Sequence, residues 1–249
     1  MSEIEQSLLG ESENMEAQWH GVYTIGGIAA VLTLIGIVLD MIVGISTGGN
    51  LSALPQTAVD RFTELQGHPL LGLYHLDLLN TIIQILSIPT YFALYAVHRK
   101  VNKPYALLAL IIFLVGTTIF VTTNTALPML ELSRKYAVAA ESHKVLLAAA
   151  GEAMLANGAH GSASVFIGFV LPTIAAFIMS CVMLSGKVFG RLNSYMGIFG
   201  NALMLVYLVL VTFIPGVQSM ATAFAMPGGL LLLAWMVMLT IKLFQISRK

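Results

Sequence analysis

The sequence predicts an all-α membrane protein, a bundle of six transmembrane helices with an additional helix on its outer face. Of its 249 residues, 57% are hydrophobic and 10% are charged, whereas an ordinary soluble domain has roughly 25% charged residues. Six segments approach the roughly 20 apolar residues that cross a bilayer core. Lipid offers the backbone no hydrogen-bond partners, so each segment is expected to be helical. The predicted spans cover about residues 21–45, 70–97, 104–128, 161–184, 195–214 and 222–246.

Residues 1–18 form an acidic tail before the first span, and we expect residues 1–249 to form a single transmembrane domain. The tail contains five glutamates and no lysine or arginine. A secretory signal peptide starts with positive charges, so the first span is expected to remain in the mature protein. The zero net charge gives no electrostatic reason to expect nucleic acid as a partner. The single cysteine, Cys181, excludes a disulfide within the chain.

The positions of lysine and arginine predict how the protein is oriented. An even number of spans places both termini on one side, together with the second-to-third and fourth-to-fifth connections. That side carries eight lysine and arginine residues, and the other side carries four. The positive-inside rule therefore predicts a multi-pass protein of the cell membrane with both termini in the cytoplasm.

Two of the connections on the outer side are long. Residues 46–69 are expected to be irregular chain, with a break at His68-Pro69. In residues 129–160, the sequence from Ser133 to Leu155 is rich in alanine and lacks proline, which favours one helix ended by Asn157-Gly158. We expect an interfacial helix that ties the third span to the fourth; a lid over the outer end of the bundle is the alternative.

Small residues cover one side of the first span. Surfaces of this kind let helix backbones approach closely in lipid. Besides the lipid bilayer, they favour packing against other membrane subunits or self-association. The residues on this side are Gly26, Ala29, Ala30, Thr33, Gly36, Asp40 and Gly44.

The second span carries a polar seam on one helix face. Spacing at the period of an α-helix places its members in one narrow sector. His75, two residues before Asp77, points to a different face. The seam consists of Asp77, Asn80, Gln84, Ser87, Tyr91 and Tyr95.

Polar residues of different spans are predicted to lie at a similar depth near the outer side. An ionisable residue inside the membrane is costly and is by default a candidate for function. The spans contain no lysine or arginine at this depth, so each carboxyl is expected to be protonated, hydrogen-bonded, hydrated, or paired with His75 or a bound cation. Hydrogen bonds between helices are the alternative to a ligand, proton or cation site. The candidates for that site are Asp40, Asp77, Asn80, Gln84 and Asn124.

A metal site is a further alternative. His75 or Asp77 with His160, Asp40 or Glu131 would form a composite site of the kind found in intramembrane zinc hydrolases, although His-x-Asp is a poor metal motif on one regular helix. No other cofactor is predicted. The sequence has no phosphate loop, no dinucleotide fingerprint and no Gly-x-Ser-x-Gly.

Several short motifs resemble a family of uncharacterised prokaryotic six-span membrane proteins, the domain of unknown function numbered four-three-eight-six. The resemblance covers roughly residues 70–200 and implies a bacterial or archaeal six-helix protein of unspecified substrate. The motifs are Leu79-Asn80, Ile88-Pro89, Ala93-Leu94-Tyr95, Asn102-Lys103-Pro104-Tyr105, Asn124-Thr125-Ala126, Gly151-Glu152-Ala153 and Tyr195-Met196-Gly197.

Three functions remain open. The first is a membrane protein without catalytic activity, either an accessory subunit of a membrane complex or a bundle that binds a lipid or small ligand. The second is a proton- or cation-coupled transporter that uses Asp40, Asp77 and Asn80. The third is an intramembrane metal-dependent hydrolase that uses His75, Asp77 and His160.

Overall fold

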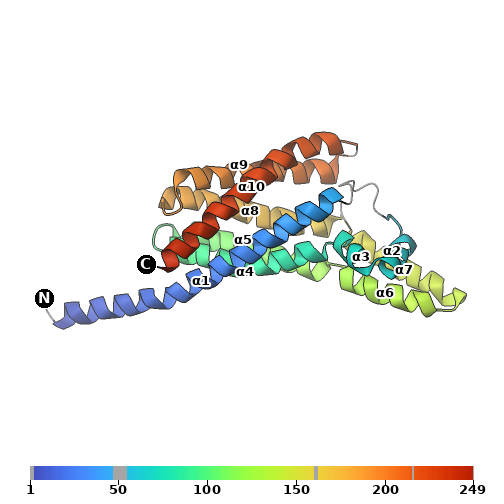
Figure 1. Ribbon diagram of the computed structural model, residues 1–249, viewed down its shortest axis with the longest axis horizontal. Helices are drawn as coiled ribbons and strands as arrows, with labels where there is room; N and C mark the ends of the chain where they lie inside the picture. The colour runs from blue at the N-terminus through green and yellow to red at the C-terminus, as the bar shows by residue number, and fades with distance from the viewer. Residues whose placement is uncertain (1–2, 47–54, 160–161, 215, 249) are drawn as a thin grey trace.

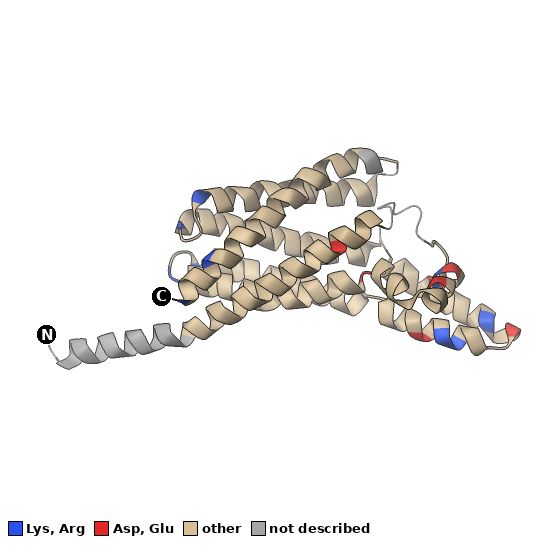
Figure 2. Ribbon diagram, in the orientation of Figure 1, with Lys and Arg blue, Asp and Glu red and all other residues tan. Residues whose placement is uncertain are grey.

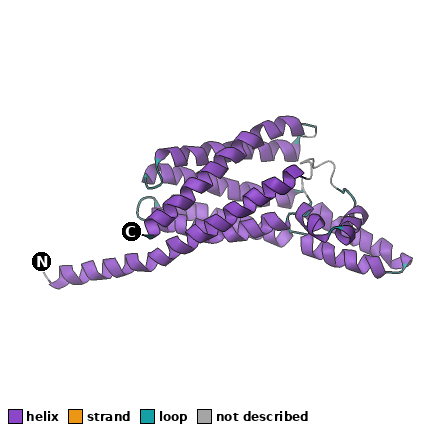
Figure 3. Cartoon of the chain, viewed as in Figure 1, coloured by secondary structure: helices purple, strands orange, loops and turns teal. Residues whose placement is uncertain are grey.

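The computed structural model describes residues 3–46, 55–159, 162–214 and 216–248, with side chains from residue 19 onward except at residues 218–219. Every regular element in these ranges is a helix, and none is a strand (Figure 3). Six helices within the described residues are long and apolar enough to cross a membrane. The predicted all-α class with six spans is confirmed.

The six long helices form a closed ring. Each packs against the next along the chain, and the last packs against the first, so α10 returns to α1. Because the helices alternate in direction, α1 begins and α10 ends at the same end of the bundle (Figure 1). The six are α1 (Glu3–Ser46), α4 (Leu78–His98), α5 (Lys103–Thr123), α8 (Ala163–Gly186), α9 (Arg191–Phe213) and α10 (Gln218–Ser247).

Shorter helices lie at the opposite end of the bundle, beyond the ends of α4 and α5 (Figure 1). They are α2 (Ala58–Gly67), α3 (Pro69–His75), α6 (Ala126–Val138) and α7 (Glu141–Gly158). We call these four helices the cap, and the end at which they lie the capped end. The cap has its own hydrophobic cluster, formed by Ala58, Phe62, Leu65, Leu76, Ala126, Met129 and Leu155.

The cap corrects two expectations. The connection at residues 46–69, expected to be irregular, contains α2; its first part, residues 47–54, lies outside the described residues. The single helix expected from Ser133 to Leu155 is instead α6 and α7, separated by extended backbone at Ala139 and Ala140. Alanine favours helix, but α6 and α7 both pack against α2, which a continuous helix could not do. The predicted helix end at Asn157-Gly158 is correct.

Two of the predicted spans are interrupted at the capped end. The second was expected to be one helix over residues 70–97, but α3 ends at His75 and α4 begins at Leu78. The third was expected to continue to Pro128, but α5 ends at Thr123 and the chain resumes helix at Ala126. Both interruptions lie next to the cap.

The small-residue side of α1 packs against α4 of the same chain. A Cβ atom placed on Gly26 would collide with the Cβ of Ala93. The Oγ1 of Thr90 donates a hydrogen bond to the main-chain oxygen of Gly26 (3.1 Å), and the hydroxyls of Thr33 and Ser87 are 3.2 Å apart. Close approach of the two backbones makes these polar contacts possible in an apolar surrounding.

Apolar side chains fill the middle of the bundle. The main hydrophobic cluster draws residues from α1, α4, α5, α8 and α10, and Met196 of α9 packs against it. At its centre the rings of Tyr91 and Phe113 stack with their centroids 3.7 Å apart. The charged residues among the described side chains lie toward the two ends of the bundle (Figure 2).

Candidate functional site

Asn124 connects the two helix interruptions. Its side-chain Nδ2 donates a hydrogen bond to the main-chain oxygen of Leu76, at 2.8 Å. Its Oδ1 accepts a hydrogen bond from the main-chain N–H of Ala126, at 3.1 Å. A helix end leaves such backbone groups without partners inside the helix. The Asn124 side chain therefore supplies a hydrogen-bond partner to one backbone group at each of the two interruptions.

Asp77 occupies the turn between α3 and α4. Its backbone is left-handed, with φ 61° and ψ 24°, a conformation that aspartate tolerates better than most residues. Its Oδ1 accepts a hydrogen bond from Nδ2 of Asn80 (3.0 Å), and its main-chain oxygen accepts one from Oγ1 of Thr81 (2.9 Å). The residue is only 5% exposed. Its carboxylate lies at the N-terminus of α4, where the helix dipole favours negative charge.

A buried charged group lies beside this turn. Nδ1 of His75 is 2.6 Å from Oε1 of Glu64, and Nη1 of Arg61 is 3.5 Å from Oε2 of Glu64. Burial lowers the pKa of the Arg61 guanidinium, and the charges of Glu64 and Asp77 oppose this effect. The expectation that no lysine or arginine lies at this depth holds for the spans alone and is wrong for the folded chain, because α2 brings Arg61 there.

Tyr74 lies close to both predicted aspartates. Its hydroxyl donates a hydrogen bond to the main-chain oxygen of Asp40, at 3.1 Å. Burial raises the pKa of Tyr74 to about 12, with further contributions from the charge of Asp40, a hydrogen bond to its side chain, and the charge of Asp77. The cap therefore brings Asp40 and Asp77, from different spans, to one phenol.

Several polar atoms of this region are buried without a hydrogen-bond partner among the described residues. Buried polar groups in folded proteins nearly always have partners, so such atoms mark a place for water or a ligand. They are Nε of Arg61, Nε2 of His75 and Oγ1 of Thr125, while Nη1 of Arg61 and Oε2 of Glu64 have only each other, at 3.5 Å. We call Asp40, Arg61, Glu64, Tyr74, His75, Asp77, Asn80 and Asn124 together the capped site.

The capped site carries more acid than base. Asp40, Glu64 and Asp77 supply three carboxyl groups, against the guanidinium of Arg61 and the imidazole of His75. Several carboxyl groups gathered in a partly buried place repel one another, and a proton or a cation relieves this repulsion. Such a site can therefore bind a proton or a small cation.

The remaining members of the seam lie deeper and take part in helix packing. Oε1 of Gln84 accepts a hydrogen bond from Oγ1 of Thr117 on α5, at 3.2 Å. Ser87 faces Thr33 of α1, and Tyr91 stacks on Phe113. Gln84 is thus placed apart from the other four predicted site residues.

The structure does not assemble the composite metal site from the side chains it describes. Glu131 is exposed and pairs with Lys135 one turn away, at 3.3 Å, whereas His75 faces Glu64. His160 lies outside the described residues. Among the described residues, no three His, Cys, Asp or Glu side chains are grouped so that they could hold a metal ion.

The sequence did contain a signal for Arg61 and Glu64, which were not predicted. Thr57, followed three residues later by Asp60, is a pattern that starts helices, and Oγ1 of Thr57 does accept a hydrogen bond from the N–H of Asp60, at 3.2 Å. Once a helix is assumed, Arg61 falls on the same face as Ala58 and Leu65, which are buried.

Comparison with known proteins identifies a family and no function. The family model described as a domain of unknown function (DUF4386) matches residues 28–242. This range includes the cap and α4, α5, α8 and α9 in full, together with the later part of α1 and most of α10. No curated protein and no solved structure matches the chain significantly.

Proposed function

The chain belongs to the DUF4386 family, whose function is unknown, and we propose that it is a membrane protein without catalytic activity that binds a proton or a small cation in the capped site. One observation carries this proposal. The capped site gathers three carboxyl groups around one guanidinium, and Nε2 of His75 is buried without a hydrogen-bond partner among the described residues.

Electrostatics favour a positively charged guest. A buried carboxylate is strongly destabilised unless it is paired, and the three carboxyl groups of the capped site attract a cation more than the single guanidinium of Arg61 repels it. Where the guest is a proton, Nε2 of His75 is one candidate acceptor, since it has no hydrogen-bond partner among the described residues.

The proposal is tested by the stability of the full-length protein in phosphatidylcholine nanodiscs. We expect acidification from about pH 8 to about pH 5, or replacement of choline chloride by sodium or potassium chloride, to raise the unfolding temperature. Glu64→Gln and Asp77→Asn should abolish that response, since they remove the charge that holds the guest.

Glu131→Gln is the matched control, because Glu131 is an exposed carboxylate of the same cap. It should respond as the wild type does. An identical pH and salt response in the wild type and in Glu64→Gln would refute binding at the capped site.

Transport is a second candidate, supported by the two interrupted helices. Transporters commonly bind substrates and coupling ions where membrane helices are discontinuous. The apolar cluster between the capped site and the other end of the bundle favours binding over conduction in the conformation described. Proton flux into vesicles that contain a pH-sensitive dye, abolished by Asp77→Asn, would establish transport.

A further inference from the structure

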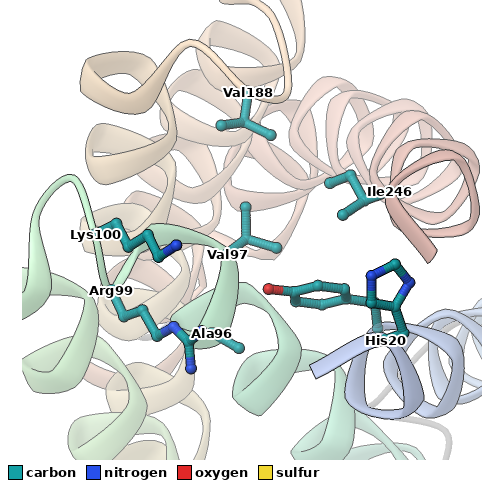
Figure 4. A pocket seen from close by; sticks show the side chains of 8 residues that line it. His20, Ala96, Val97, Arg99, Lys100, Val188 and Ile246 are labelled. Atoms are coloured by element: carbon teal, nitrogen blue, oxygen red, sulfur yellow. The ribbon is translucent and has the colours of Figure 1, made fainter. Parts of the chain in front are cut away.

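A second polar site lies at the end of the bundle away from the cap. A cavity of about 330 Å³ opens there between α1, α4, α10 and the turns that follow α4 and α8 (Figure 4). This volume is within the range of small-ligand pockets, about 300–1,000 Å³. We call the cavity the basic pocket.

The basic pocket has a polar side and an apolar side. His20 and Tyr23 of α1 and Arg99 and Lys100 after α4 supply the polar groups. Val97, Val188 and Ile246 supply most of the apolar lining. Figure 4 shows the Arg99 and Lys100 side chains on one side of the pocket, with Val188 and Ile246 on other sides.

Contacts between helices hold the polar side in place. The guanidinium of Arg99 lies over the ring of Trp19, 3.7 Å from its centroid. Nδ1 of His20 lies 3.4 Å from the main-chain oxygen of Ser247, which ties α1 to the end of α10. Tryptophan and tyrosine in such positions are typical of the level of the lipid headgroups.

Charge is segregated between the two ends of the bundle (Figure 2). Within residues 19–248, every aspartate and glutamate lies in the capped half, from Asp40 to Glu152. The cations around the basic pocket are Arg99, Lys100, Lys103, Lys187, Arg191, Lys242 and Arg248. The described side chains around the pocket are therefore cationic, whereas the glutamates of the acidic tail belong to residues 1–18.

We infer that the basic pocket binds the phosphoryl group of an anionic phospholipid. An arginine fork and a lysine ammonium are the usual protein partners of phosphate oxygens, and the Tyr23 hydroxyl and the His20 ring can add donors. Basic pockets between membrane helices at the headgroup level recognise anionic lipids in this way.

The surroundings of the pocket favour a lipid over free phosphate as the source of that group. One side of the pocket is apolar, which a free phosphate ion would leave unused. Farther along the two helices that line the pocket, α1 exposes Ile25 (59%) and α10 exposes Ile241 (54%), against which acyl chains can pack. A lipid satisfies both the polar and the apolar parts of the site.

The experiment measures lipid retention by the full-length protein. Nanodiscs of phosphatidylcholine with and without phosphatidylglycerol are prepared, and lipids that remain bound after transfer to detergent are counted by native mass spectrometry. We expect preferential retention of phosphatidylglycerol. A cation near the membrane surface is worth about fivefold in affinity, so the double variant Arg99→Gln, Lys100→Gln should retain it roughly 30-fold less well.

The matched control is Lys103→Gln with Arg191→Gln, which removes two exposed cations at the same end that do not line the pocket. It should retain phosphatidylglycerol as the wild type does. If the double variant does not fold, Lys100→Gln alone provides a second variant, because Lys100 is an exposed residue. We expect it to retain phosphatidylglycerol about fivefold less well than the wild type.

Three results would overturn the inference. The first is equal retention of the two lipids by the wild type. The second is an equal loss in the control and in the pocket variants, because it would indicate a general surface charge effect. The third is stabilisation of the protein in pure phosphatidylcholine by inorganic phosphate to the same extent as by phosphatidylglycerol, because it would identify a soluble anion as the ligand.

Discussion

The Asn124 side chain is the residue on which the geometry of the capped site most depends. It satisfies a carbonyl group after α3 and an N–H group before α6, and neither group has a partner within its own helix. Because Leu76 immediately precedes Asp77, the bond from Asn124 also fixes the turn that presents the Asp77 carboxylate.

Asn124→Ala should lower the free energy of unfolding by about 2 kcal/mol, since each lost hydrogen bond contributes about 1 kcal/mol. Denaturant unfolding in mixed micelles measures this loss. Asn102→Ala is the control, because Asn102 precedes the other end of α5 and its side chain makes no capping hydrogen bond there. Similar losses for the two variants would show that Asn124 has no special structural role.

Tyr74 predicts a dependence of stability on alkaline pH. Its pKa is raised to about 12, above the usual value of about 10, so folding favours the neutral phenol. Its stabilising contribution is complete below about pH 10 and is lost as the pH rises toward about 12.

Tyr74→Phe should be about 1 kcal/mol less stable than the wild type at about pH 8, through loss of the hydrogen bond to Asp40. This difference should shrink above about pH 10, as measured by unfolding curves at each pH. Tyr105→Phe, at an exposed tyrosine, should follow the wild type. A constant difference between Tyr74→Phe and the wild type would contradict the assignment.

Four of the residues in the capped site could be predicted because they stand out against an apolar background. Asp40, Asp77, Asn80 and Asn124 are polar residues within or at the ends of hydrophobic segments, where each is costly. Arg61 and Glu64 lie in a short polar segment between spans, where charged residues are ordinary. The helix start at Thr57 was a local signal for α2, but that α6 and α7 pack against it is a tertiary feature that no local pattern reveals.

At the scale of helices, hydropathy located the six long elements because lipid imposes both their length and their helical backbone. It did not locate the interruptions. The hydrogen bond from the Asn124 side chain to the main-chain oxygen of Leu76 links the extended backbone at Asn124 to the left-handed turn at Asp77. Such a tertiary contact cannot be predicted from the local sequence. Proline was also a poor guide, since Pro128 lies inside α6 rather than at the end of α5.

The contact between α1 and α4 gives a prediction about a helix pair. Gly26→Leu should destabilise the protein by about 2 kcal/mol, because the new side chain collides with Ala93 and forces the two helices apart. Gly21→Leu on the same helix is the control, since a Cβ there meets nothing within 4 Å. Its effect should stay within about 0.5 kcal/mol. An equal loss of unfolding free energy in the two variants, measured by denaturant unfolding, would show that the Gly26 contact does not stabilise the protein.

At the scale of the whole molecule, the separation of charge predicts the orientation in the membrane. Among the side chains that the structure describes, lysine and arginine gather at the end where α10 stops (Figure 2). The positive-inside rule predicts that this end lies in the cytoplasm and the cap on the other side.

Cysteine labelling of intact cells tests this orientation in a Cys181→Ala background. Ala140→Cys, in the turn between α6 and α7, should react with a membrane-impermeant maleimide. Val101→Cys, exposed in the turn after α4, should react only after the cells are permeabilised. The reverse pattern would place the cap in the cytoplasm.

The closure of the ring by α1 and α10 has a consequence for biosynthesis. Within the ring, the helix that is synthesised first packs against the one that is synthesised last, with Gly27 close to Phe244 and Thr24 close to Ser247. One flank of α1 therefore stays in contact with lipid or the insertion machinery until α10 has been made. A permuted chain in which α10 is joined to α1 and the ring starts at α4 would instead deliver α10 and α1 consecutively, and this pair could form before the ring closes elsewhere.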